Sequence, residues 1–171
     1  GRQRHGAFQY GLPQRSDSTW LFISLALEKL RPAEQGGGRL AALVNPGALS
    51  SGGATGAVRR RIVEAGLLES VTRLPDGLAP NTAIPLYLLT FSNRAGHAGS
   101  GKAMIADLQT MFTTEHGRKS IPVEAFRELV QLVGEALRMG VAVANVHGGS
   151  SVTLRSRVCC RRARCATVAR S

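Results

Sequence analysis

The 171-residue sequence has few of the features that mark membrane, secreted or metal-binding proteins. No apolar run approaches the roughly 20 residues of a membrane-spanning helix, and the first residues show no apolar core of a signal peptide. The three cysteines, Cys159, Cys160 and Cys165, are clustered near the end of the sequence, and an odd, clustered count makes no disulfide framework. These absences predict a protein of the reducing cytoplasm with no membrane segment.

Residue spacing alone reveals no catalytic or metal-binding motif. The four histidines are scattered and none lies at metal-ligand spacing to another histidine or to a cysteine, so no metal site is expected. Residues 96–102 have the spacing of a phosphate-binding loop, but Ala103 stands where a Ser or Thr would bind magnesium. The residues that follow are typical of a strand, whereas such a loop must open a helix. We interpret 96–102 as a loop between strands, and a nucleotide-binding enzyme is the least favoured function.

The net charge of +11 is unevenly distributed. Residues 151–171 hold six of the 22 basic side chains and no acidic one, so a charge of +5 remains on residues 1–150. That excess is compatible with contacts to DNA phosphates, although many enzymes carry as much. Arg59, Arg60 and Arg61 are consecutive, and successive helical residues turn by about 100°. They cannot all face one DNA strand, which favours a solvated helix face with one functional arginine.

The apolar pattern predicts an α/β chain. The expected elements are helices at 19–30, 54–65 and 122–140 and strands at 40–44, 67–74, 84–91 and 103–107. Asp17 or Ser18 is expected to cap the first helix, which is apolar on more than one side. The first strand is a continuous apolar run, typical of a strand buried on both faces, and the last is expected at a sheet edge. A glycine-rich loop is expected between the first strand and the second helix.

The second half of the chain changes character along its length. The helix that begins at Pro122 carries a narrow apolar stripe suited to pairing with another helix, formed by Val123, Phe126, Val130, Val133 and Leu137. Beyond it, an irregular stretch rich in Arg, Ser and Cys is typical of a shifted reading frame. We predict a domain part at 1–110, a helical extension at 111–140 and an irregular basic tail at 141–171.

An ordered series of short motifs resembles the modification subunits of type I restriction systems, which are adenine-specific DNA methyltransferases. The resemblance covers about residues 8 to 130, and the order and spacing of the motifs agree as well as the residue types. The series comprises Tyr10-Gly11, Ser16-Asp17-Ser18-Thr19-Trp20-Leu21-Phe22, Gly38-Arg39-Leu40-Ala41-Ala42-Leu43-Val44-Asn45-Pro46-Gly47, Ser51-Gly52-Gly53, Val58-Arg59, Leu74-Pro75-Asp76-Gly77 and Asn81-Thr82-Ala83-Ile84-Pro85.

The resemblance implies a partial Rossmann-like, S-adenosylmethionine-dependent methyltransferase fold, followed by a helix and an irregular tail. The strands present here would be the last three of the family's sheet with their helices, and the final two would form an antiparallel hairpin. The implied reaction moves a methyl group from S-adenosylmethionine to the amino group of a flipped adenine in DNA. The implied partners are DNA, a specificity subunit and a restriction subunit.

The sequence departs from the family where the chemistry takes place. The Asn-Pro-Pro-aromatic motif that holds the target amino group is absent, since Asn45-Pro46 is followed by Gly47 and comes one strand too late. The glycine-rich cofactor loop is absent as well, so no catalytic or cofactor-binding residue is assigned.

The candidates for DNA contact are Arg59, Asn81 and Thr82, and the matched positions Gly11 and Asp17 are expected near the cleft. We expect the chain to be inactive when isolated. The alternative is a non-catalytic remnant that binds DNA or a partner.

Overall fold

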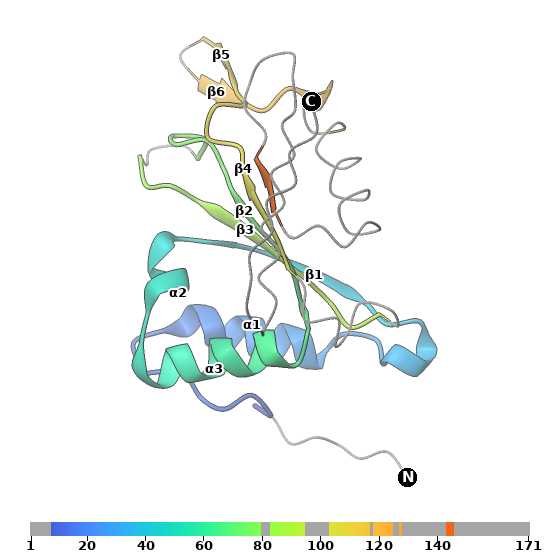
Figure 1. Ribbon diagram of the computed structural model, residues 1–171. Helices are drawn as coiled ribbons and strands as arrows, with labels where there is room; N and C mark the ends of the chain where they lie inside the picture. Colours follow the sequence, from blue (N-terminus) through green and yellow to red (C-terminus); the bar gives the residue numbers. More distant parts are fainter. Residues whose placement is uncertain are drawn as a thin grey trace, which may run out of the picture. The chain divides into compact units, whose positions relative to one another are not determined.

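The computed structural model describes residues 8–79, 83–94, 103–116, 118–124, 127 and 143–145. A five-stranded sheet has the order β1-β3-β2-β4-β7, and β5 and β6 form a separate two-stranded sheet (Figure 1). The strands are β1 (Arg39–Val44), β2 (Leu68–Arg73), β3 (Tyr87–Ser92), β4 (Met104–Asp107), β5 (Thr113–Glu115), β6 (Arg118–Ser120) and β7 (Val143–Asn145). The helices are α1 (Ser18–Glu28), the short 3-10 helix η1 (Ala33–Gln35), α2 (Pro46–Ser50) and α3 (Gly53–Glu64).

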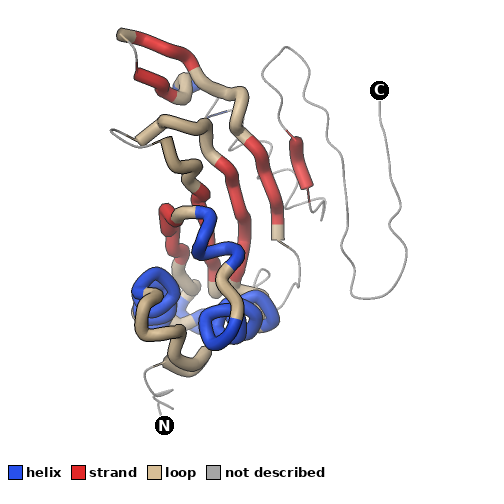
Figure 2. Tube along the Cα trace, turned by 90° about the vertical axis from the view of Figure 1, so that its left-hand side faces the viewer, coloured by secondary structure: helices blue, strands red, loops and turns tan. Residues whose placement is uncertain are grey.

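The chain divides into two compact units. The first comprises Gly1–Glu69 and Leu89–Gly101, and the second comprises Ser70–Leu88 and Lys102–Ser171. In the first unit, α1 contacts both α3 and β1. Figure 2 draws the helices in blue and shows α1 and α3 side by side.

Helix α1 begins at Ser18, one residue before the expected start, and Asp17 caps it as the sequence predicts. The carboxylate of Asp17 accepts hydrogen bonds from the backbone N–H groups of Thr19 and Trp20, which otherwise lack an intrahelical partner. The buried residues of α1 recur at helical spacing and are Trp20, Ile23, Ser24 and Leu27. The expectation that α1 is buried on more than one side holds only in part, because Leu21, Leu25 and Ala26 are partly buried while Phe22 is 66% exposed.

Strand β1 is confirmed, but the expectation that both its faces are buried is wrong. Exposed residues alternate with more buried ones along the strand, and Leu43 is 58% exposed. Helix α1 contacts this strand, and strand side chains alternate between two faces, so covering one face buries every second residue. Arg39 lies on the exposed set, and its guanidinium pairs with the nearly buried carboxylate of Glu69 at 2.6 Å.

The expected glycine-rich loop after β1 contains a further helix. Asn45 caps α2 by accepting a hydrogen bond from the N–H of Ala48, and Pro46 occupies the first turn, where its missing N–H costs nothing. Helix α3 follows at Gly53, one residue before the expected start.

The predicted antiparallel pairing of β2 and β3 is confirmed by two backbone hydrogen bonds. Ser92 N donates to the Leu67 carbonyl at one end, and Leu74 N donates to the Leu86 carbonyl at the other. Asn93 N donates to the Gly38 carbonyl, so the end of β3 lies beside the start of β1. Strands β1 and β2 are therefore both antiparallel to β3 and parallel to one another, with α2 and α3 in the crossover. Strand β3 starts at Tyr87 rather than at the expected Ile84.

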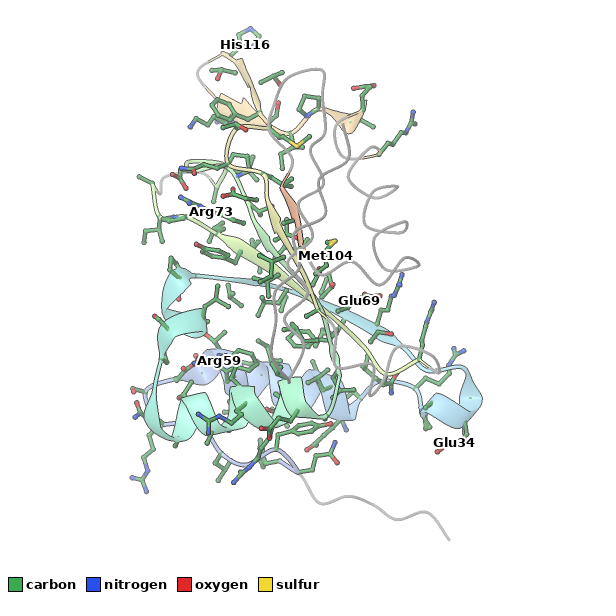
Figure 3. The ribbon with its side chains drawn as sticks, in the orientation of Figure 1. Glu34, Arg59, Glu69, Arg73, Met104 and His116 are labelled. Atoms are coloured by element: carbon green, nitrogen blue, oxygen red, sulfur yellow. The ribbon has the colours of Figure 1, made fainter. Side chains whose placement is uncertain are left out.

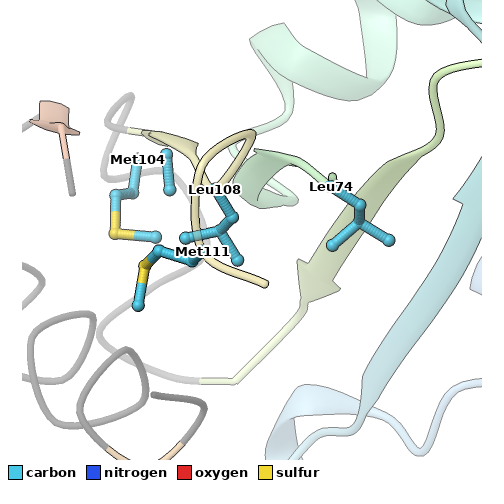
Figure 4. Close-up of a cluster of buried hydrophobic side chains, with 5 residues drawn as sticks. Leu74, Met104, Leu108 and Met111 are labelled. Atoms are coloured by element: carbon cyan, nitrogen blue, oxygen red, sulfur yellow. The ribbon is translucent and has the colours of Figure 1, made fainter. Parts of the chain in front are cut away.

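The second unit contains a parallel arrangement around β4. Ser70 is in register with Met104 in the β2–β4 pair, and Ile105 is in register with Val143 in the β4–β7 pair. The predicted strand at 103–107 is thus confirmed, but its placement at a sheet edge is wrong because β7 pairs with its other side. The buried apolar cluster of this unit consists of Leu74, Met104, Ala106, Leu108 and Met111 (Figure 4).

The β5–β6 hairpin was not predicted. Val123, Glu124 and Arg127 are helical, as expected for the helix after Pro122, and Val123 is 60% exposed. The other stripe residues, the three cysteines and the 96–102 loop lie outside the described residues, and so does the predicted tail at 141–171 apart from β7, which is a regular strand within a stretch expected to be irregular. Within the described part of the chain, no helix is long and apolar enough to span a membrane, and no cluster of side chains could hold a metal ion.

Candidate functional site

A polar pocket of about 380 Å³ lies in the first unit, at the carboxyl end of β1. It lies between the loop that enters α1 and the first turn of α2. The carboxyl end of a strand that enters a crossover helix is where α/β proteins commonly bind ligands. The lining residues are Gln14, Ser16, Asp17, Ser18, Thr19, Asn45, Gly47, Ala48 and Ser51.

Residues 8–14 form a segment that crosses α1 and α3, which we call the strap. The strap leads into one wall of the pocket. The backbone N–H of Phe8 donates to the carboxylate of Glu28 on α1. At the other end of the strap, Gln14 N donates to the hydroxyl of the buried Thr55 on α3, at 3.2 Å. The strap therefore fixes the position of Gln14, which lines the pocket.

Gly11 allows the strap to pass close to α3. Its φ of +94° is unfavourable for residues with a side chain, and a Cβ there would lie 2.5 Å from a guanidinium nitrogen of Arg61. The same nitrogen, Nη1, donates to the Tyr10 carbonyl at 3.1 Å. Gly11 and Arg61 thus act together to hold the strap, which gives this glycine a structural role.

The Tyr10 side chain is half-buried beside α1. Burial raises the pKa of its phenol above the usual value, and the negative charge of Glu28 raises it further, while a hydrogen bond with Gln9 acts in the opposite direction.

The second wall of the pocket is the first turn of α2, and Ala48 anchors it. Its N–H is held by the Oδ1 of Asn45 at 3.2 Å. Its carbonyl accepts two hydrogen bonds, from Trp20 Nε1 on α1 at 2.8 Å and from Arg59 Nη1 on α3 at 3.1 Å. Arg59 belongs to α3, and Figure 3 labels it near α2 and the other helices of this unit. Two helices therefore hold the wall that carries Asn45.

The sequence-predicted residues fall in different places. Arg59 is half-buried and bonded to Ala48, and Asp17 lines the pocket while capping α1. Asn81 and Thr82 lie outside the described residues, so their predicted contact with DNA stays a prediction. Sequence reasoning missed Asn45 as a pocket residue, although an Asn-Pro pair after a strand is a recognisable start of a helix.

The chemistry of the pocket is that of neutral hydrogen bonding. Hydroxyl and amide groups dominate the lining, and the carboxylate of Asp17 is the one charged group. The lining contains the carboxylate of Asp17 and no cation, so the carboxylate of S-adenosylmethionine would meet like charge and find no countercharge. The pocket does not fit this cofactor.

A family model for N-6 DNA methylases matches residues 2–148. The chain belongs to the N-6 DNA methylase family. This match confirms the family resemblance. The partial α/β methyltransferase fold is confirmed as well, because solved methyltransferase subunits have a similar fold. No curated protein sequence matches this N-6 DNA methylase chain.

Three solved structures of similar fold come from type I restriction-modification systems. The methyltransferase subunit from Streptococcus thermophilus has a TM-score of 0.67 and 20% identity, over 77% of this chain and 27% of that one. A modification subunit of a putative type I restriction enzyme from Vibrio vulnificus has a TM-score of 0.54 and 27% identity, over 71% and 26%. The EcoKI M protein has a TM-score of 0.54 and 21% identity, over 68% and 24%. The chain thus spans about a quarter of the length of these structures.

Proposed function

We propose that this chain is part of an adenine-specific DNA methyltransferase, which transfers a methyl group from S-adenosylmethionine to the amino group of adenine in DNA. The observation that carries the proposal is the N-6 DNA methylase match over residues 2–148. The Vibrio vulnificus modification subunit, at 27% identity, extends the proposal to the modification subunit of a type I system. The specificity and restriction subunits of such a system would be its partners, in the cytoplasm.

We also propose that the 171-residue chain does not transfer methyl groups by itself. The Asn-Pro-Pro-aromatic motif is absent from its sequence, and the lining of the pocket at β1 offers no cation for the carboxylate of S-adenosylmethionine. Methyl transfer requires the sulfonium methyl and the acceptor nitrogen in line, which is mainly a matter of positioning. A chain that holds neither reactant by the family's motifs should therefore be inactive.

The test is a transfer assay with radiolabelled S-adenosylmethionine and unmethylated genomic DNA. The purified chain should incorporate no more label than a reaction without protein, while a complete adenine methyltransferase in parallel labels the DNA. Labelling of adenine by the purified chain would overturn the claim of inactivity. Co-purification of a tagged chain with a co-expressed type I specificity subunit tests the proposed partner.

A second candidate function is a non-catalytic module that binds DNA or a partner protein. The exposed Val123, at the start of the apolar stripe, favours a partner that packs on this helix, and Arg59, Asn81 and Thr82 are the proposed DNA contacts. Duplex DNA affinity should be measured at several salt concentrations for the chain and for a variant with Gln at the six arginines within 151–171. Affinity that persists in the variant supports binding by the folded part, whereas affinity that disappears was due to tail charge.

A further inference from the structure

We propose that the β5–β6 hairpin enters the major groove of duplex DNA, with the side chains of Arg118, Thr113 and Ser120 facing the groove. Lys119 is the positioning residue that holds the hairpin. This inference rests on the proposed function, because it assumes that the chain meets DNA. It concerns a surface of the second unit, whereas the pocket and Arg59 belong to the first unit.

The hairpin has the dimensions of a ribbon that fits the major groove. Its strands form a two-stranded sheet of their own, and Figure 3 labels His116 at the tip. Each strand has 3 residues, which span about 10 Å at roughly 3.3 Å per residue. The major groove is about 8.5 Å deep and about 12 Å wide, and it admits a two-stranded ribbon. The length of the strands therefore matches the depth of the groove.

The composition of the hairpin favours DNA over a protein partner. Its strand residues are all polar and include two cations and one acid: Thr113, Thr114, Glu115, Arg118, Lys119 and Ser120. Protein–protein interfaces have an apolar core enriched in aromatic residues, which these strands cannot supply. Protein–DNA interfaces are more polar, more positively charged and hydrated. The net charge of +11 on the chain adds a long-range attraction to DNA.

The face of the hairpin that carries Arg118 is open to solvent. Cross-strand partners share a face, and the hydroxyl oxygens of Thr113 and Ser120 accordingly lie 3.1 Å apart. Because side chains alternate along a strand, Arg118 lies on the same face as Ser120. All three residues are exposed. This face presents a guanidinium and two hydroxyls, which are groups that proteins use to contact base edges and phosphates.

Lys119 holds the hairpin from the opposite face. Its Nζ donates to the carbonyl of Asp76 at 2.8 Å and lies 4.2 Å from the centroid of the Phe112 ring. A carbonyl and an aromatic ring carry no net charge, so neither contact neutralises the ammonium group. The carboxylate of Asp76 accepts hydrogen bonds from Arg73 at 3.5 Å and from Gln109 at 3.2 Å. Lys119 therefore fixes the base of the hairpin while its positive charge remains.

The central test is Arg118→Gln, with affinity for a short fluorescent duplex measured at several salt concentrations. The affinity should fall about fivefold or more, as expected for an arginine at a base edge. The matched control is Arg31→Gln, the same change at an exposed residue of the first unit. It corrects for the loss of one positive charge and should lose less affinity. Thr113→Val, which keeps the shape of the side chain without its hydroxyl, should also lower the affinity.

The groove is tested with a duplex whose cytosines carry glucosylated hydroxymethyl groups, which fill the major groove. The wild-type chain should bind this duplex more weakly than the plain duplex, and Arg118→Gln should have no further effect on it. Netropsin, which occupies the minor groove, should leave the effect of Arg118→Gln unchanged. The melting temperature of each variant reports whether the fold is retained.

The positioning role is tested by Lys119→Met and Lys119→Arg, and by Lys119→Met together with Arg118→Gln. Lys119→Met should lower the affinity, and Lys119→Arg should recover part of it, because arginine can also donate to the Asp76 carbonyl. Since Lys119 acts through the hairpin, the double variant should lose less affinity than the sum of the single losses. The slope of log affinity against log salt should stay unchanged for Lys119→Met. Additive losses with a slope lower by about one would identify a phosphate contact and overturn the positioning role.

The outcomes separate this inference from the proposed function. If the chain binds duplex DNA but Arg118→Gln behaves like Arg31→Gln, the inference is overturned and the proposed function stands. If the wild-type chain binds the glucosylated and plain duplexes equally, entry into the major groove is overturned. If the chain binds no duplex DNA, the inference and DNA contact by this chain are both overturned, while co-purification with the specificity subunit still tests its place in a methyltransferase.

Discussion

The edge-to-face pair of Trp20 and Phe91 offers a direct measurement of packing in the first unit. The ring centroids are 6.4 Å apart with an interplanar angle of 85°, and both side chains are almost completely buried. The change Phe91→Leu removes the aromatic pair, worth about 0.5–1.5 kcal/mol beyond area burial. It also leaves part of the ring volume empty. The cost of this cavity is a fraction of the roughly 3–5 kcal/mol that full truncation of phenylalanine to alanine costs in the free energy of unfolding. We expect a loss of about 1.5–3 kcal/mol in the free energy of unfolding.

The assay is urea unfolding followed by tryptophan fluorescence and by circular dichroism. Trp20 is the single tryptophan, so its emission reports on the environment that Phe91 shapes. Phe22→Leu is the matched control, because Phe22 lies on α1 and is 66% exposed. It should change the unfolding free energy by no more than about 0.5 kcal/mol. Equal effects of the two changes would refute the assignment of this pair to the core.

Three further changes test local features of the same unit. Asp17→Ala should lower the unfolding free energy by about 0.5–2 kcal/mol, because alanine lacks the oxygen that caps α1. Asp17→Asn keeps a capping oxygen and should stay near wild type, and thermal unfolding measures both variants. Gly11→Ala and Gly36→Ala should each destabilise by about 1–3 kcal/mol, because both positions have a positive φ and the guanidinium that faces Gly11 ends an exposed side chain that can move aside. Urea unfolding compares them. The raised pKa of Tyr10 means that the folded state favours the neutral phenol. The stabilisation that Tyr10 contributes to the folded state is therefore present below pH 10 and is lost as pH rises through the folded-state pKa. Unfolding across that range should therefore show a steeper loss for wild type than for Tyr10→Phe, and parallel curves would contradict this.

Features that depend on neighbouring residues in the sequence were predictable. The cap at Asp17 and the buried spacing of Trp20 and Leu27 follow from helix geometry alone. The start of α2 at Asn45-Pro46 carries an equally local signal, but the glycines around it favoured a loop. The exposure of Leu43 could not be predicted, because an apolar strand gives no sign of whether a second layer covers it. The pairing of β4 with β7 depends on residues far apart in the sequence.

The candidate site was predictable only in part, because its geometry is tertiary. The family resemblance brought attention to Asp17 and Gly11, and the structure places Asp17 in the pocket and Gly11 in the strap beside it. The convergence of Trp20 and Arg59 on one carbonyl has no counterpart in residue spacing, since 39 positions separate the two. A backbone acceptor carries no sequence signal, so Ala48 could not be singled out.

The arginine triplet on α3 shows how a charge pattern acquires different roles in the fold. Arg59 donates to the carbonyl of Ala48, Arg61 donates to the carbonyl of Tyr10, and Arg60 between them is exposed. Since successive residues turn by about 100° on a helix, each guanidinium meets a different surface, and two of the three meet protein backbone. A carbonyl satisfies a guanidinium hydrogen without neutralising its charge, so the positive field stays while the side chain is fixed. The positive charge of the triplet therefore remains, although the fold holds two of its three guanidinium groups against backbone carbonyls.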